Sequence, residues 1–389
     1  MAIYHCSIRI ISRGKGKSAV AASAYRSGTK LIHVKTDPAS GKQTNVTCDY
    51  SSKVGVVYSN IFVPDEFAPN EFVPEEFSSS NSNNKAAWIF DRAKLWQRVE
   101  DVETRSNARL AREFEIALPV ELNQEQNILL IEEFVRDSLV ARGMVADVNI
   151  HYDNPENPHV HIMTTTRMLV ELENGEITFG AKNTDWDKKE ILQLVRSELA
   201  DIINKHLHLH GFDSRVSHLS YKELGVDLTP GVHEGPARYI ESAQLAAKNQ
   251  QIKIENAKLI EQHPELVLGK LSISNPVFTK DDLSNALAKT LNTGIVNKFI
   301  DIDNTKTSKE FMGAFSELMD SDKLTTILEY DLQGHSLYCR TDRLKLEQSY
   351  IRKIKQLSSS NNHSLNINND DLDKLDLGSN IAQNNSVFG

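Results

Sequence analysis

The stretch HYDNPENPHVHIMTTTR, residues 151–167, carries three histidines at the entrance to an apolar, β-branched run. Successive side chains of a strand point to opposite faces, so His159 and His161 lie side by side, about 6 to 7 Å apart, while Val160 points into the core. Between His151 and His159 the segment DNPENP has strong turn chemistry. The segment DVNI runs into His151 as a second strand. The sequence therefore predicts a β-hairpin that brings His151 beside the other two imidazoles.

Three converging histidines have two interpretations. Three neutral imidazoles with open coordination positions can hold a divalent metal ion, with water or a substrate phosphate in the remaining positions. Histidines two residues apart also occur as ordinary polar residues at the end of a strand. The local pattern leaves both interpretations open.

Length and composition set outer bounds on the protein. The 389 residues suffice for two domains and a sizeable core. No apolar run approaches the roughly 20 residues that span a bilayer, and the N-terminus lacks a signal-peptide core, so we expect a cytoplasmic protein without membrane insertion. The three cysteines, Cys6, Cys48 and Cys339, are too few and too scattered for a disulfide framework or a zinc cluster. We interpret them as structural or incidental.

Charge is distributed unevenly along the chain. The whole chain carries a net charge of -9, but residues 1–60 hold nine Lys and Arg against two Asp, a net of +7. A basic segment on an acidic body indicates a local phosphate-binding surface, for which Arg13, Lys15, Lys17 and Arg26 are the candidate DNA contacts. The alternative is a solvated basic loop.

The first half of the chain alternates predicted strands and helices. A strand over residues 2–12 precedes a short helix that Ser18 caps and Gly28 ends. The further predicted elements are a hairpin within 31–58, a surface loop over 63–84, one long helix or two broken ones over 85–111, a strand over 112–119, and helices over 123–143 and 187–210. This order predicts an α+β fold with helices covering a central antiparallel sheet.

Two other motifs do not support a functional interpretation. Gly14-Lys15-Gly16-Lys17-Ser18 ends like a P-loop, but Ile11 stands where the first glycine of that motif belongs. The residues His206, His208 and His210 fall on a predicted helix, where only His206 and His210 share a face. An ordinary helix end explains them.

Tyr25, in the segment AASAYRSG, is a candidate nucleophile. Arg26 flanks it, and the basic turn that could hold a DNA backbone lies close by. A tyrosine hydroxyl has an ordinary pKa of about 10 and needs a cation or a base to lower the cost of deprotonation. The alternative is a core tyrosine in an Ala-rich helix.

Several separate segments of residues 1–236 resemble the MobA/MobL family of plasmid-mobilisation relaxases, in the HUH endonuclease superfamily. They are MAIYH, SRGKGKSAVAASAYRSG, FEIALPVELN, NPENPHVHIM and GVDLTPGVHEGP. They are most similar to the relaxase part of TraA proteins from Ti-type conjugative systems. The resemblance implies a palm-like relaxase fold for residues 1–236.

The resemblance also implies roles for individual residues. The family's nucleophile is the tyrosine of the AYRSG-like segment, which is Tyr25 here. Its H-x7-H-x-H histidines hold a divalent ion, Mg²⁺ or Mn²⁺, and these match His151, His159 and His161.

An acidic residue in the strand before ALP assists catalysis in relatives. This indicates Glu115, which we favour, or its same-face neighbour Glu113. A solvated strand face is the alternative for both glutamates. The family's DHR-like motif reads Ser217-His218-Leu219 here, which puts a role for that segment in doubt.

Residues 237–357 are predicted to be mostly helical. They resemble the region that leads into a helicase motor in TraA-type proteins, but no GxxxxGK[ST] motif occurs in the chain, so we do not expect ATP hydrolysis. Residues 358–389 are predicted to be a disordered polar tail.

The resemblance implies a site- and strand-specific nickase that cleaves and rejoins DNA at a plasmid transfer origin through a 5′-phosphotyrosine. The expected partners are single-stranded or hairpin origin DNA, accessory transfer proteins and a type IV secretion coupling protein, in the bacterial cytoplasm. The order of tyrosine before histidines favours a relaxase over the first alternative, a rolling-circle-type replication initiator. A second alternative is a non-catalytic DNA-binding accessory derived from a relaxase.

Overall fold

The computed structural model describes residues 4–36, 41–68, 86–232, 240–292, 305–329 and 334–359. The chain divides into two compact units, Met1–His218 and Leu219–Gly389. The boundary predicted after residue 236 falls outside the described residues, as do most of the loop predicted over 63–84 and nearly all of the tail predicted over 358–389. Within the described residues, no helix combines the length and the hydropathy needed to cross a bilayer.

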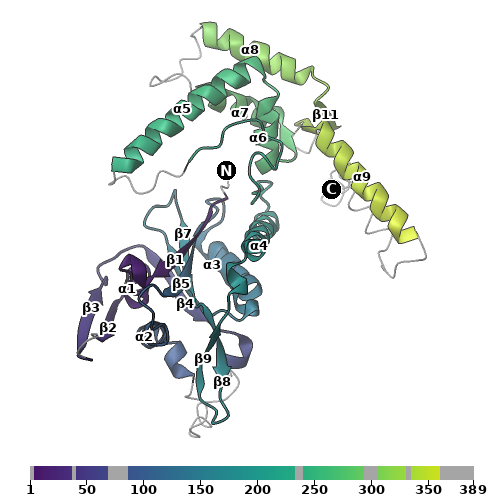
Figure 1. Cartoon of the computed structure of the whole chain (residues 1–389). Coiled ribbons are helices and arrows are strands. Elements are labelled where there is room, and N and C mark those ends of the chain that lie inside the picture. Colours follow the sequence, from purple (N-terminus) through teal and green to yellow (C-terminus); the bar gives the residue numbers. More distant parts are fainter. Residues whose placement is uncertain are drawn as a thin grey trace. The chain divides into compact units, whose positions relative to one another are not determined.

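The centre of the first unit is a five-stranded antiparallel sheet in the order β1-β5-β7-β6-β4. Figure 1 shows strands of this sheet between helices α1 and α3. Its strands are β1 (Cys6–Ser12), β4 (Val56–Phe62), β5 (Arg109–Ala117), β6 (Ala146–His151) and β7 (His159–Thr164). Strands β6 and β7 form the predicted hairpin, with His151 directly opposite His159. The predicted α+β class is confirmed.

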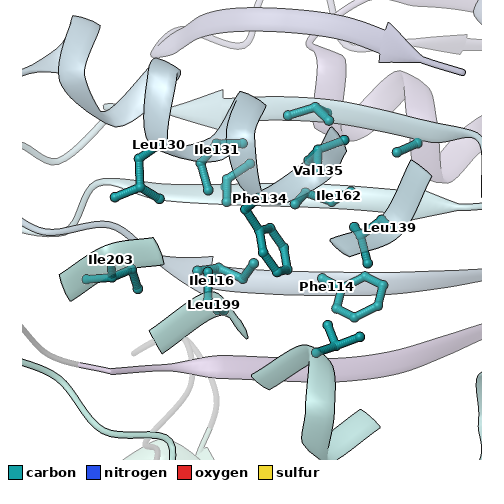
Figure 2. Close-up of a cluster of buried hydrophobic side chains, with 14 of the residues drawn as sticks. Phe114, Ile116, Leu130, Ile131, Phe134, Val135, Leu139, Ile162, Leu199 and Ile203 are labelled. Atoms are coloured by element: carbon teal, nitrogen blue, oxygen red, sulfur yellow. The ribbon is translucent and has the colours of Figure 1, made fainter. Parts of the chain in front are cut away.

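One face of this sheet is packed with hydrocarbon. Phe114 and Ile162 form a buried cluster with side chains of α3 (Gln124–Phe134) and α4 (Lys189–Leu209), as Figure 2 shows. Helix α3 begins at the predicted cap, where the Asn123 side chain accepts from the Gln126 N–H at 2.9 Å and the Gln126 side chain accepts in return from the Asn123 N–H at 2.9 Å. Helices α3 and α4 thus cover one face of the sheet.

The opposite face packs against α1 (Ala19–Ser27) and α2 (Arg92–Val102), whose residues Val20 and Trp96 are fully buried. Helix α1 confirms the prediction. Ser18 Oγ accepts from the Ala21 N–H at 3.3 Å, and Gly28 ends the helix with a φ of 62°. Polar residues of the sheet point toward this side, because side chains alternate along each strand.

Three segments differ from the sequence prediction. Within residues 86–111 a short 3-10 helix (Ala87–Ile89) precedes the α-helix Arg92–Val102, so one long helix is wrong and the broken alternative describes the segment better, although β5 already begins at Arg109. The hairpin expected within 31–58 consists of β2 (Lys30–Thr36) and β3 (Gln43–Asp49), while the residues from Val56 join the main sheet. A second hairpin, β8 (Arg167–Glu171) and β9 (Ile177–Lys182), was not predicted.

The second unit is mainly helical, as predicted. Its helices are α5 (Ile240–Gln262), α6 (Leu266–Ser274), α7 (Lys280–Asn292), α8 (Thr305–Met319) and α9 (Thr341–Ser359). The prediction missed a small sheet in the order β10-β12-β11, formed by β10 (Phe278–Thr279), β11 (Leu324–Leu328) and β12 (Leu337–Arg340). Val226 and Leu228 belong to this unit's own core.

Candidate active site

Three histidine side chains converge on the face of the main sheet that packs against α1. His151 ends β6, and His159 and His161 begin β7. The turn between the strands is closed by the Asn157 N–H, which donates to the Asn154 carbonyl at 2.9 Å. The ring centroids lie 5.0, 5.1 and 5.2 Å apart, and one nitrogen of each ring lies within 4.8 Å of the others. The predicted convergence is confirmed, and this triad could hold a metal ion.

Each imidazole of the triad donates one N–H to a fixed acceptor. Nε2 of His151 lies 2.7 Å from the Arg26 carbonyl oxygen, and Nδ1 of His159 lies 3.0 Å from the carbonyl oxygen two residues before it. Nδ1 of His161 lies 3.0 Å from Oε1 of Glu113. These oxygens only accept at neutral pH, so the facing nitrogen carries the proton and the other ring nitrogen keeps its lone pair.

The electrostatic environment keeps the buried rings neutral. Burial lowers the pKa of His151 to about 3, against a smaller raising effect of the Arg26 carbonyl. Burial also lowers the pKa of His161. Neutral imidazole is the form that binds a divalent ion, and the orienting acceptors match the outer shell usual around metal-bound histidines. The donor set therefore fits such an ion.

Glu113 joins the histidines to helix α1. It is 4% exposed, and its Oε1 lies 3.0 Å from Nδ1 of His161 and 2.6 Å from Nε of Arg26. Burial raises the pKa of Glu113, but the His161 hydrogen bond and the Arg26 charge outweigh it and lower that pKa to about 2. Glu115, favoured from the sequence, lies opposite His161 in the β5–β7 register, yet its carboxylate pairs with Arg9 at 3.3 Å. The structure brings Glu113 to the triad.

Tyr25 lies near the end of α1 with 44% of its surface exposed. The carbonyl of the next residue, Arg26, accepts from His151. Two residues before Tyr25, Ser23 Oγ donates to the fully buried Asp147 at 2.6 Å, and Asp147 also accepts from Trp96 Nε1 at 2.9 Å. Helix α1 is thus tied to the sheet on both sides of the tyrosine.

Sequence reasoning missed Lys53 and Tyr50, which follow β3 and contact Tyr25. Nζ of Lys53 lies 4.2 Å from the centroid of the Tyr25 ring and donates to the Tyr25 carbonyl at 3.1 Å. The Tyr50 ring packs edge-on at 5.3 Å. The local signal was Gly55, which has a φ of 88° and whose added Cβ would meet Asp153 Cβ at 2.7 Å. That close approach holds this turn against the DNPENP segment.

The four predicted DNA contacts lie in two different environments. Arg13 pairs with Glu100 at 2.9 Å and donates to carbonyls at the end of α2. The Arg26 guanidinium pairs with Glu113, and the Arg26 side chain is only 13% exposed. Lys15 and Lys17 are exposed just before α1, where neither forms an ion pair with the described residues.

The second histidine array is a helix end, as expected. Nε2 of His206 lies 3.0 Å from a Glu133 carboxylate oxygen, and the rings of His206 and His210 are 6.4 Å apart on a shared face. The three cysteines are free thiols.

The fold and the site define a class: an α+β protein with a histidine triad suited to a metal ion and an exposed tyrosine on the helix bonded to that triad. The chain belongs to the MobA/MobL family, whose family model matches residues 17–242.

The chain is also similar to individual proteins. The chain is 31% identical over 314 residues to "Probable conjugal transfer protein TraA" of Sinorhizobium fredii, a match covering 74% of this chain and 27% of that protein. It is 29% identical over 270 residues to "Mobilization protein MobL" of Acidithiobacillus ferridurans, covering 61% of this chain and 63% of that protein. A solved structure described as "Molecular Basis of Vancomycin Resistance Transfer in Staphylococcus aureus" is 36% identical, covers 57% of this chain and 100% of that chain, and has a TM-score of 0.44. The chain therefore spans about a quarter of the TraA relative's length.

Proposed function

We propose that this protein nicks one DNA strand at a plasmid transfer origin, which starts conjugation, and rejoins the strand after transfer. The observation that carries the proposal is the junction at Arg26, the residue after Tyr25. Its carbonyl accepts from His151, and its guanidinium pairs with Glu113, which accepts from His161. One residue thus couples the helix of the nucleophile to the metal ligands. Membership of the MobA/MobL family supports the same function.

The reaction is a transesterification at phosphorus. The Tyr25 Oη attacks the scissile phosphate, forms a phosphorus–oxygen bond and releases the phenolic proton to solvent. The bond from phosphorus to the 3′ oxygen breaks, and that oxygen takes up a proton to become a free 3′-hydroxyl. In the reverse step a 3′-hydroxyl attacks the phosphotyrosine and restores the strand.

Several residues support this step. When bound to the triad, Mg²⁺ or Mn²⁺ supplies positive charge to the phosphoryl oxygens. The ammonium of Lys53, 4.2 Å from the Tyr25 ring centroid, stabilises negative charge that develops on the phenol. Glu113 orients His161. Lys15 and Lys17 attract backbone phosphates, so binding should weaken as salt rises.

The partners follow from this function. We propose single-stranded or hairpin DNA at a transfer origin as the substrate, in the bacterial cytoplasm. Accessory transfer proteins and a type IV secretion coupling protein complete the proposed set.

A circular single-stranded DNA pool with a randomised segment tests the proposal without knowledge of the origin. The full chain is incubated with the pool and Mn²⁺, covalent complexes are isolated under denaturing conditions, and the attached DNA is sequenced. Because nicking opens the circle without losing nucleotides, the captured strand reports both flanks of the cleaved bond. We expect one consensus sequence and a covalent adduct that a chelator prevents.

The matched variants are Tyr25→Phe and Tyr50→Phe. Removing the Tyr25 hydroxyl should lower adduct formation at least about a thousandfold. Tyr50→Phe removes the same group from the neighbouring ring and should retain the adduct. Absence of any adduct with Mg²⁺ or Mn²⁺, or an adduct that survives in Tyr25→Phe, would contradict the proposal.

A further inference from the structure

We propose that a pocket beside Tyr25 binds the base of a nucleotide next to the nicked bond, an inference that rests on the function proposed above. The pocket has a volume of about 330 Å³ and lies between helix α1 and the β2–β3 hairpin. Tyr25 and Arg26 belong to its lining, so it adjoins the nucleophile. A strand whose phosphate reaches Tyr25 must place a neighbouring nucleotide near this pocket.

The two walls of the pocket follow from regular structure. Ala22 and Tyr25 of α1 and its cap residue Ser18 line it at helical spacing, which puts them on one face. His33 and Val46 face them from the hairpin, where they are direct partners in the β2–β3 register. Cross-strand partners share a face, so the hairpin presents a continuous surface to the helix.

The lining combines apolar surface with positive charge. Ala22 and Val46 provide small apolar groups, and Ile11, which is 1% exposed, also lines the pocket. Lys17 and Lys35 supply cations, and no carboxylate lies among the lining residues. An apolar slot with a cationic border matches a flat base attached to an anionic backbone, and it disfavours a cationic ligand.

His33 gives the pocket a means of reading the base. It is 6% exposed, and its Nδ1 lies 3.1 Å from Ser18 Oγ. Ser18 Oγ can donate to Nδ1 while it accepts from the Ala21 N–H. In the tautomer that accepts from Ser18, the ring proton is on Nε2, from which it can be donated to an acceptor on a base edge.

The experiment uses the full chain and the consensus oligonucleotide from the circular pool, with an abasic nucleotide placed at each position in turn. Single-turnover adduct formation and dissociation constants by fluorescence anisotropy are measured for the wild type and for two variants. Val46→Phe fills the pocket from β3. Thr47→Phe adds the same ring one residue later, on the opposite, exposed face of the same strand.

In the wild type and in Thr47→Phe, removing one base beside the cleaved bond should weaken binding or slow cleavage about tenfold. In Val46→Phe the intact oligonucleotide should already bind more weakly or be cleaved more slowly by the same factor. Removing the same base should then cause no further change in binding or cleavage. This loss of coupling distinguishes an occupied pocket from a general disturbance of the hairpin.

A third variant tests the polar side of the pocket. Lys35→Gln should weaken binding and reduce its salt dependence without changing which base is read. An adduct whose abasic penalties are the same in Val46→Phe and the wild type overturns the pocket and leaves the nickase standing. Absence of an adduct in the wild type overturns both proposals.

Discussion

The two faces of the five-stranded sheet differ in what they bury: one packs a hydrocarbon cluster under α3 and α4, while the other, here called the polar face, adds buried carboxylates and imidazoles to its own apolar cluster under α1 and α2. On β5, Phe114 points into the hydrocarbon cluster under α3 and α4, while its neighbour Glu113 points toward α1 and the histidines. On β7, Val160 and His161 divide in the same way. Burial of the hydrocarbon on the α3/α4 side stabilises the strands from that side. The close-packed α3/α4 side supports the strands from behind. The charged side chains and the three adjacent imidazoles on the opposite face depend on that support for their geometry.

The largest expected effect comes from damaging the apolar face. Phe114→Ala leaves a cavity beneath a fully buried ring and should lower the free energy of unfolding by about 3–5 kcal/mol. Urea unfolding followed by tryptophan fluorescence measures this effect in the first unit alone, because all three tryptophans, Trp88, Trp96 and Trp186, lie there.

The control for that change is Phe90→Ala, since Phe90 is 39% exposed. Phe90→Ala should lower the free energy of unfolding by much less than Phe114→Ala does. Equal losses would mean that the cluster under α3 does not hold the sheet, and the proposed division between the two faces would fail.

A smaller effect is expected from the polar face, where it should appear in metal binding. Glu113→Gln keeps the shape of the side chain but removes the charge that orients His161, so Mn²⁺ affinity should fall about 10- to 100-fold. Isothermal titration calorimetry of the full chain with Mn²⁺ measures it. Glu115→Gln changes the same group two residues along the same strand and should leave the affinity unchanged. The reverse ranking would show that the sequence-based preference for Glu115 was the better one.

Much of this division was predictable because local rules impose it. Strand alternation put His159 and His161 on one face, and the DNPENP turn returned His151 to them. The caps at Ser18 and Asn123 also followed from local chemistry, since a side chain there satisfies backbone N–H groups of the first turn.

The remaining features depend on which segments meet in space. The register places Glu115 opposite His161, but side-chain direction and the position of Arg26 bring Glu113 into contact instead. Lys53 meets Tyr25 because Gly55 lets its turn approach the histidine hairpin. The β5 boundary was misjudged because Leu110 and Ala111 are buried on both faces of a central strand and so read like a helix continuation.

The smallest effect concerns the salt bridges that Glu103 forms with two cationic side chains. Glu103, which follows α2, is 6% exposed and lies 2.9 Å from Arg167 Nε and 3.1 Å from Lys182 Nζ, so it ties α2 to the β8–β9 hairpin. Burial raises the pKa of Glu103, but the hydrogen bonds from these two cations outweigh it and hold the pKa below its usual range.

A carboxyl group whose folded pKa is depressed stabilises the fold above its ordinary pKa of about 4.3, and that contribution disappears as the pH falls through the lower folded value. Glu103→Gln should therefore cost about 1 kcal/mol near pH 7, and the difference from wild type should shrink as the pH drops below the ordinary value. Urea unfolding at several pH values measures the difference, with Glu173→Gln on the exposed β8–β9 turn as the control that changes nothing. A cost that stays constant with pH would mean that Glu103 acts through packing, and the polar face would then resemble the apolar one at this point.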